Sequence, residues 1–206
     1  MEIDVDYGVV PYFVLVLYNH DWPIYNCIDY VQKFGAGMLM STLSEIMPKK
    51  HARVIDLVSA AGVNVDDWEN VQGGPHKAAA NPKYCYEWAF VQPKKVVVLN
   101  LWYEALVERN GKIVRDLNMR ESAKEFGQLP YKAIWGLRAL RMDKAIQKAI
   151  NSKLPIRVIL CSGQRRGIDQ PKTIASKVKK RLLDLVPWTV TAYDWNTGQC
   201  TLTRGN

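Results

Sequence analysis

The sequence predicts an α+β protein in which a curved, mainly antiparallel sheet of five to six strands packs with three to four helices. Short β-branched and aromatic runs recur along the chain, and several are joined by tight turns, which is typical of antiparallel hairpins. Segments with helical periodicity are grouped between these runs. Because 48% of the 206 residues are hydrophobic, the chain has enough apolar surface to bury a core.

The first 37 residues differ from the rest, and we expect residues 1–37 to be an N-terminal extension made of a strand and a short helix. Residues 38–206 are then an α+β nucleic-acid-binding domain. The apolar run at 9–18 is too short for a bilayer span of about 20 residues. The acidic residues before it do not suit a signal peptide. We therefore expect a cytoplasmic protein that does not contact a membrane, with an extension that either joins the fold or projects from it.

The predicted domain begins with a helix over residues 49–61, where apolar side chains recur at helical spacing and Gly62 suits the position after the last turn. Residues 64–70 are expected to form a short capped turn around Asp66 and Asp67. Residues 72–82 are rich in glycine and proline, which predicts a loop.

Two strands are expected next, at residues 83–91 and 95–103, with a hairpin turn at 92–94. In the first strand, four aromatic residues alternate with other side chains and so share one face. The second strand is apolar almost throughout, as in a central strand that is buried on both faces.

The middle of the chain is expected to be mainly helical. Residues 104–130 are predicted to be helix and loop with a turn at Asn110-Gly111, and Asn118 caps a short helix over 118–126. The clearest helix covers residues 131–150, and a β-branched strand follows at 156–161.

The C-terminal part is predicted to contain a polar loop, a helix and a hairpin. The loop covers residues 162–167, and the helix covers 169–185 because apolar residues recur at every fourth position. The hairpin strands lie at 188–195 and 199–203, with Gly198 in the turn.

The positive charge of the chain is concentrated in one region. The formal net charge is +8, and residues 131–183 contain 14 lysines and arginines against two acidic residues. A basic balance of this kind favours polyanionic partners, nucleic acid first and acidic membrane second. The alternative is an ordinary solvated helix surface. We favour nucleic acid, because clustering like charges opposes folding and suggests a use.

The candidate nucleic-acid-binding residues lie on two predicted helices, in the 162–167 loop and in the 72–82 loop. Lysine and arginine side chains position a nucleic acid by contacting phosphates, and arginine also matches a guanine edge. The alternatives are a solvated helix face, a flexible charged turn and an ordinary loop. The candidates are Arg138, Arg141, Lys144, Lys148, Arg165, Arg166, Lys177, Lys180, Arg181, His76 and Lys77.

A second group of candidates could form a pocket for one nucleotide. Asn100 is unusual within an apolar strand because a buried amide needs hydrogen-bond partners, and Glu87 lies on the neighbouring predicted strand. Polar groups among aromatic rings suit a flipped base or stacked bases. The alternative is ordinary core packing. The pocket candidates are Tyr86, Trp88, Asn100 and Trp102.

The sequence contains none of the motifs that would identify an enzyme. We find no HNH, PD-ExK, Walker or catalytic-triad pattern, and the three histidines have no metal-ligand spacing. The four cysteines, Cys27, Cys85, Cys161 and Cys200, are far apart and are interpreted as reduced, mainly core residues. We therefore predict no catalytic residue, no metal and no cofactor, and consider intrinsic activity the less favoured hypothesis.

Several segments resemble a known bacterial module. They are Asp66-Asp67-Trp68, residues 73–90, residues 176–182 and residues 186–205. The resemblance is to the module that precedes HNH nuclease domains in restriction-type proteins, and it covers residues 41–205. It implies a DNA-recognition function directed at a modified base or a modified backbone, with cleavage by a separate HNH nuclease domain or subunit. It assigns no role to a particular residue.

The sequence therefore leads to one preferred function and three alternatives. The preferred hypothesis is a module that binds double-stranded, modified DNA for a restriction-type HNH nuclease. The alternatives are an RNA- or single-strand-binding protein, a divergent nuclease with an unrecognised site, and a domain whose basic face binds an acidic protein.

Overall fold

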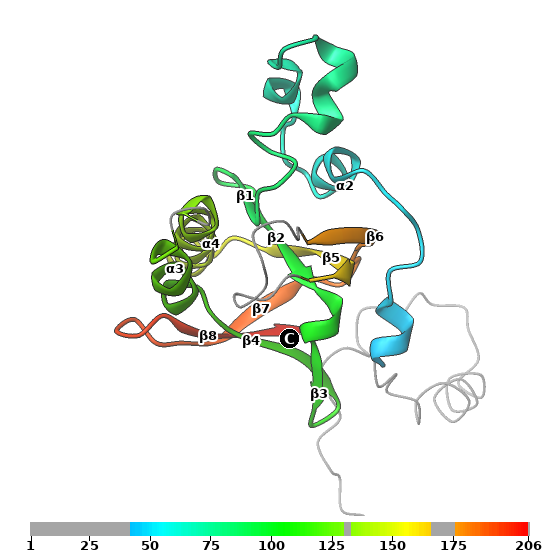
Figure 1. The fold of residues 1–206 in the computed structure, drawn as a ribbon. Helices are drawn as coiled ribbons and strands as arrows, with labels where there is room; N and C mark the ends of the chain where they lie inside the picture. The colour runs from blue at the N-terminus through cyan, green and yellow to red at the C-terminus, as the bar shows by residue number, and fades with distance from the viewer. Residues whose placement is uncertain (1–41, 130–132, 166–175, 206) are drawn as a thin grey trace, which may run out of the picture. The chain divides into compact units, whose positions relative to one another are not determined.

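The computed structural model describes residues 42–129, 133–165 and 176–205. These residues form an open, mostly antiparallel sheet of eight strands with helices packed against it (Figure 1). The α+β class is thus confirmed, with more strands than predicted. The predicted extension at residues 1–37 lies outside the described residues. No described helix has both the length and the apolar character needed to cross a bilayer.

The strand order is β1-β2-β5-β7-β8-β4-β3, and β6 also pairs with β5. Strands β2 and β5 run parallel, whereas the other pairs are antiparallel. The strands are β1 (Ala89–Gln92), β2 (Val96–Trp102), β3 (Val107–Arg109), β4 (Lys112–Asn118), β5 (Ile156–Gln164), β6 (Lys177–Leu183), β7 (Trp188–Tyr193) and β8 (Gln199–Arg204).

Two longer α-helices, one short α-helix and several 3-10 helices accompany the sheet. Helix α3 begins after Asn118, whose side chain accepts a hydrogen bond from the Glu121 amide, as predicted for a capping residue. Helices α3 and α4 lie side by side (Figure 1). The described helices are η2 (Leu43–Ile46), α2 (Val54–Ala60), η3 (Asp66–Glu69), η4 (Pro75–Ala80), η5 (Tyr103–Ala105), α3 (Met119–Gly127) and α4 (Ala133–Asn151).

The sheet divides at β5. One edge of this strand pairs with β7 at Ile156 and with β6 over its later residues. The chain turns between β6 and β7 at Asp184, whose buried carboxylate accepts hydrogen bonds from the Trp188 indole at 2.8 Å and from Arg204 at 2.7 Å. Strand β6 therefore separates from the β7–β8–β4 part of the sheet.

Two hydrophobic cores lie on opposite faces of the central strands. Val97, Leu99 and Leu101 of β2 face the core beneath α4, whereas Val96 and Val98 face the core beneath α2. Because each buried aliphatic side chain contributes roughly 1.5–3 kcal/mol, burial on both faces explains why the sequence of β2 is almost wholly apolar.

Several predicted elements are confirmed. The β1–β2 hairpin, helices α3 and α4, strand β5 and the C-terminal β7–β8 hairpin all lie close to their predicted positions. The predicted helix at 49–61 is shorter, because Arg53 has extended backbone and α2 begins at Val54.

Three predictions were wrong. Residues 83–88 are not strand, because the chain turns around Asn81, whose side chain bonds the Trp68 carbonyl and the Lys83 amide. Residues 104–130 contain the β3–β4 hairpin, which turns at Asn110-Gly111 as expected. The helix predicted over 169–185 is strand β6 at Lys177–Leu183, because long-range pairing with β5 overrides the local apolar spacing.

Candidate nucleic-acid interface

The α4 candidates have two different environments. Glu87 lies 2.6 Å from the Arg141 guanidinium and 3.8 Å from that of Arg138, and the side chains of Glu87 and Arg138 are 11% and 13% exposed. A phosphate contact by either arginine would compete with this carboxylate. Lys144 and Lys148 are exposed on the same helix and form no ion pair within the described residues.

The candidates of the predicted 169–185 helix lie instead on strand β6. Lys177, Lys179 and Lys180 are exposed. Arg181 is half-buried. Its backbone amide donates to the Lys50 carbonyl at 2.9 Å, and its guanidinium donates to the Ala52 carbonyl at 3.1 Å. Lys177 and Lys180 therefore remain candidate phosphate ligands, whereas Arg181 joins β6 to the segment before α2.

Cations from three segments meet at this strand. Lys50 forms an antiparallel bridge with Arg181 along the outer edge of β6, and Arg165 follows Gln164, the residue paired with Lys177. We call this group the β6 basic edge. It consists of Lys49, Lys50, Arg165, Lys177, Lys179 and Lys180.

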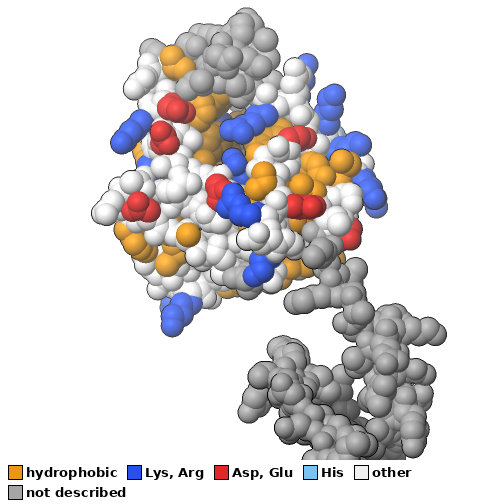
Figure 2. Space-filling view, turned by 90° about the horizontal axis from the view of Figure 1, so that it is seen from below, with side chains coloured by type: hydrophobic (Ala, Val, Ile, Leu, Met, Phe, Trp, Pro, Cys, Tyr) orange, Lys and Arg blue, Asp and Glu red, His pale blue; other side chains and the backbone are white. Residues whose placement is uncertain are grey.

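None of these six residues forms an ion pair in the part of the chain that the structure describes. Figure 2 shows a face on which lysine and arginine side chains alternate with acidic ones around an apolar hollow. The β6 basic edge is thus a local concentration of charge without ion pairs among the described residues, whereas the face in Figure 2 mixes both signs.

Gly163 determines how β6 lies against β5. The register shifts between Ser162 and Gly163, and a Cβ atom at Gly163 would overlap the Lys177 carbonyl. The absence of a side chain at Gly163 thus admits the backbone of β6. The polar loop predicted at 162–167 begins later than expected, because β5 continues through Gln164. The candidate Arg166 lies outside the described residues.

The four pocket candidates do not share one environment. Trp102 packs against the core beneath α2, whereas Trp88 packs against the core beneath α4 and meets Phe126 edge-on at 6.1 Å. Tyr86 is 61% exposed, and the Arg138 guanidinium lies 5.6 Å from its ring centre. Tyr86 is therefore the candidate with an accessible ring.

The Asn100 side chain makes a hydrogen bond within the fold through its amide nitrogen but not through its oxygen. Its side-chain amide donates to the Glu87 carbonyl at 2.8 Å, while its buried Oδ1 atom accepts no hydrogen bond. The buried Nε atom of Arg138 also forms no hydrogen bond within the described residues, although it lies 3.8 Å from the Glu87 carboxylate. Asn100 thus holds the turn that presents Glu87 to Arg138 and Arg141.

His76 and Lys77 lie on another part of the molecule. Both are exposed on η4, which packs against η3 and α2. Their position does not extend the β6 basic edge.

The described cysteines have the character of core residues. Cys161 and Cys200 are buried, Cys85 is half-buried, and all three are free thiols. Burial raises the pKa of Cys161 to about 11 and the pKa of Cys200 to about 12. Both thiols are therefore protonated near neutral pH and are poor nucleophiles. Among the described residues, no group of histidine, cysteine and carboxylate side chains could hold a metal ion.

Sequence reasoning missed Arg115, a half-buried cation on β4. Its guanidinium donates to the Ala105 carbonyl at 3.3 Å, and burial, followed by the nearby charge of Arg165, lowers its pKa. Alternation with the buried Ile113 and Leu117 was the signal that could have found it. That signal was lost because residues 104–130 were interpreted as helix and loop.

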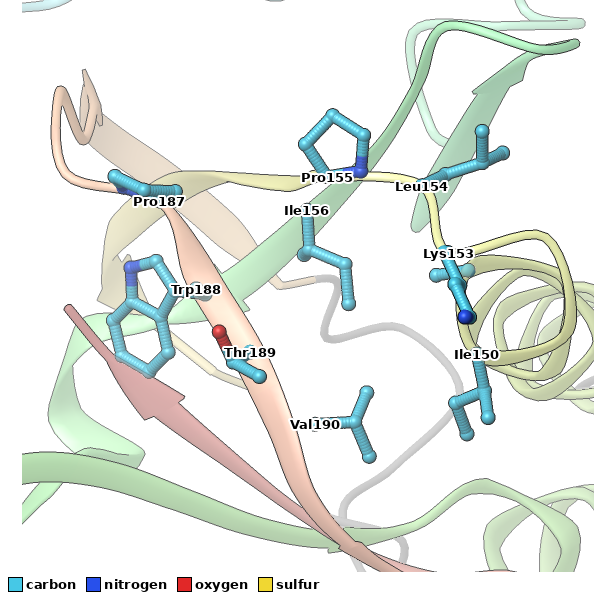
Figure 3. A pocket seen from close by; sticks show the side chains of 10 residues that line it. Ile150, Lys153, Leu154, Pro155, Ile156, Pro187, Trp188, Thr189 and Val190 are labelled. Carbon is cyan, nitrogen blue, oxygen red and sulfur yellow. The ribbon is translucent and has the colours of Figure 1, made fainter. Parts of the chain in front are cut away.

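A cavity of about 430 Å³ lies where α4 ends and β5 and β7 begin. The side chains of Ile150, Ile156 and Val190 surround it, and Lys153 lies at its border (Figure 3). Its lining is mainly apolar and includes no member of the β6 basic edge.

Comparisons of the chain with protein-family models, with curated proteins and with solved structures found no match.

Proposed function

We propose that this chain is a DNA-binding module whose β6 basic edge contacts backbone phosphates. The observation that carries the proposal is the set of lysine and arginine side chains from three segments that have no acidic partner in the described chain. Phosphate contacts of this kind supply most of the affinity for a duplex without reading its sequence. Lys144 and Lys148 of α4 are additional candidates for such contacts.

A finer proposal concerns the kind of DNA and the source of cleavage. The resemblance of residues 41–205 to the module that precedes HNH domains favours recognition of a modified base or backbone, on behalf of a nuclease domain or subunit. Tyr86 is the predicted pocket residue that offers its ring to solvent, so it is the best candidate to stack on a base.

Lysines on an edge strand have a second use, which the test must separate from DNA binding. They protect an exposed strand from pairing with other chains. We would replace Lys177, Lys179 and Lys180 by glutamine and compare the variant with a control in which Lys94, Lys95 and Lys124 are replaced, which removes the same charge elsewhere. The proposal expects only the first variant to lose duplex affinity while remaining monomeric. Equal affinities with new aggregation would assign the lysines to edge protection.

A binding panel at fixed salt tests the finer proposal. It compares unmodified, methylated, hydroxymethylated and phosphorothioate duplexes with single-stranded RNA. Preference for a modified duplex supports the restriction-type function, whereas preference for RNA favours the alternative. Incubation with plasmid and Mg²⁺ or Mn²⁺ tests the remaining hypothesis, because clean cutting by this chain alone would establish an intrinsic nuclease.

A further inference from the structure

The end of β5 and the beginning of β6 form a two-stranded ribbon beyond the rest of the sheet. Strand β2 pairs with β5 only as far as Cys161, and β7 pairs with it only at Ile156. Among the described strands, residues 162–164 of β5 therefore pair with β6 alone (Figure 1). We call residues 162–164 and 177–180 the β5–β6 ribbon.

Both edges of the β5–β6 ribbon are fixed at its base. On the β2 side, the Glu104 carboxylate accepts hydrogen bonds from the Ser162 hydroxyl at 2.6 Å and from the Gly163 amide at 3.0 Å. On the outer side, the Arg181 amide donates to the Lys50 carbonyl at 2.9 Å. Because like charges repel, a polyanion is expected to contact the β6 side of the ribbon, away from Glu104.

Side chains alternate between the two faces of the ribbon, and residues paired across it share a face. Leu160 and Leu182 are paired, and both contact the core beneath α4. Two polar pairs follow on the same face, namely Ser162 with Lys180 and Gln164 with Lys177. This face is therefore apolar within the sheet and polar where the ribbon extends beyond it.

The opposite face of the ribbon offers little to a ligand. Gly163 has no side chain, and its register partner Val178 packs against the core beneath α2. The register shift after Ser162 leaves Lys179 as an extra residue of β6. A ligand of the β5–β6 ribbon is therefore expected to contact the polar face.

The polar face carries one amide beside two cations. Gln164, Lys177 and Lys180 are exposed, and neither lysine forms an ion pair with a described residue. Paired strands lie about 4.7–4.9 Å apart, so a two-stranded ribbon fits into the major groove of B-DNA, which is about 12 Å wide. The minor groove, which is about 6 Å wide, is too narrow for it.

We infer that the β5–β6 ribbon enters the major groove of DNA and that Gln164 contacts a base edge there. The inference rests on the proposed function, to which it adds the groove and a residue that reads sequence. The glutamine amide donates to N7 of adenine and accepts from its N6 amino group. Lys177 and Lys180 contact phosphates on the walls of the groove.

Chemical interference identifies the groove. Dimethyl sulfate methylates guanine at N7 in the major groove and adenine at N3 in the minor groove, and a duplex library of random sequence can carry both modifications. After binding to the full chain, the bound fraction should be depleted of N7-methylguanine and not of N3-methyladenine. Depletion of N3-methyladenine alone would place the contact in the minor groove and overturn the inference.

Two single variants separate the base contact from the phosphate contacts. The wild type should select adenine at one position of the unmethylated library, and Gln164→Ala should lower this discrimination by about 5- to 150-fold with an unchanged salt slope. Lys177→Gln should keep the preference and make the log–log salt slope shallower by about 0.9. Gln199→Ala is the matched control, because Gln199 is also exposed at the end of a strand, and it should change neither property.

The outcomes separate this inference from the proposed function. Salt-dependent duplex binding without N7 interference, or without an adenine preference that depends on Gln164, would overturn the inference and leave the proposed function standing. A wild type that binds no duplex at any salt concentration would overturn both.

Discussion

Residues 177–181 and 184–188 belong to one short stretch of chain, but their charged groups have opposite surroundings. In the first, Lys177, Lys179 and Lys180 are exposed and have no acidic partner in the described chain. In the second, Asp184 is 2% exposed and accepts hydrogen bonds from the Trp188 indole and from Arg204. Paired and buried charge holds the corner between β6 and β7, whereas unpaired and exposed charge remains available for a ligand.

The same contrast separates the β6 basic edge from the tip of the β7–β8 hairpin. There, the buried Asp143 accepts hydrogen bonds from Arg120, Gln147 and Tyr193. Arg120 also donates to the Trp195 carbonyl. Arg120 is thus held by partners within the fold, whereas the lysines of the β6 basic edge form no ion pair among the described residues. We infer that the first kind of cation stabilises the fold and that the second kind is available to a ligand. Variants can test each side.

The largest expected effect is on stability, at Asp184. Replacing Asp184 by alanine leaves the Trp188 N–H group and the Arg204 guanidinium without their buried acceptor, and removal of one member of a buried ion pair costs about 3–5 kcal/mol. Guanidinium denaturation should show this loss, with a smaller one for Asp184→Asn. DNA affinity of the folded fraction should stay unchanged. A variant as stable as the wild type would refute the structural role of this carboxylate.

The second prediction concerns pH and the buried side of β6. Cys161 pairs with Arg181, yet burial outweighs this neighbouring charge and raises the pKa of the thiol from 9.0 to about 11. The protonated thiol is favoured in the folded state, so its contribution is complete below pH 9 and disappears as pH rises through 11. The change corresponds to about 3 kcal/mol.

Unfolding free energies measured from pH 8 to pH 11 should therefore fall more steeply in the wild type than in Cys161→Ala. The difference between the two curves isolates this thiol from other groups that titrate in the same range. Parallel curves would mean that the pKa of the Cys161 thiol is the same in the folded and unfolded states, which would contradict the effect of burial.

The third prediction concerns Gly163 and the position of β6. In Gly163→Ala, the new methyl group overlaps the Lys177 carbonyl, so β6 must shift, at a cost of about 1–3 kcal/mol. Duplex affinity should fall as well, because the lysines move with their strand. Gly127→Ala is the matched control: its new methyl group meets no atom within 4 Å and the backbone there is helical, so the free energy of unfolding should rise by about 0.4–1 kcal/mol. Shifts of opposite sign in the melting temperatures of the two variants would confirm that β6 packs closely against Gly163, whereas equal shifts would contradict it.

Local signals in the sequence identified many of the elements. The Asn118 cap, the apolar run of β2 and the turn at Gly198 each contain enough information in a few residues to define an element. Strand β6 could not be found in this way, because Val178 and Leu182 suit a helix and only pairing with β5 makes the segment a strand. The aromatic alternation at 83–88 predicted a strand, but these residues follow a turn around Asn81 and do not pair with another strand.

The candidate site was predictable in composition but not in arrangement. Clustered charge indicated Lys177 and Lys180 of β6 but not Lys179. The pairing of Glu87 with Arg138 and Arg141 could not be predicted, because these side chains are distant in the sequence. The position of Arg115 beside η5 likewise depends on the fold, because its guanidinium donates to the Ala105 carbonyl.

The most direct measurement is the dependence of duplex affinity on salt concentration for the wild type and for the variant with Lys177, Lys179 and Lys180 replaced by glutamine. If each lysine neutralises one phosphate, the log–log slope of the variant should be shallower by about 2.7, whereas replacement of Lys94, Lys95 and Lys124 should leave the slope unchanged. A wild-type affinity that does not respond to salt, or equal slopes in all three proteins, would contradict the claim that the β6 basic edge binds DNA.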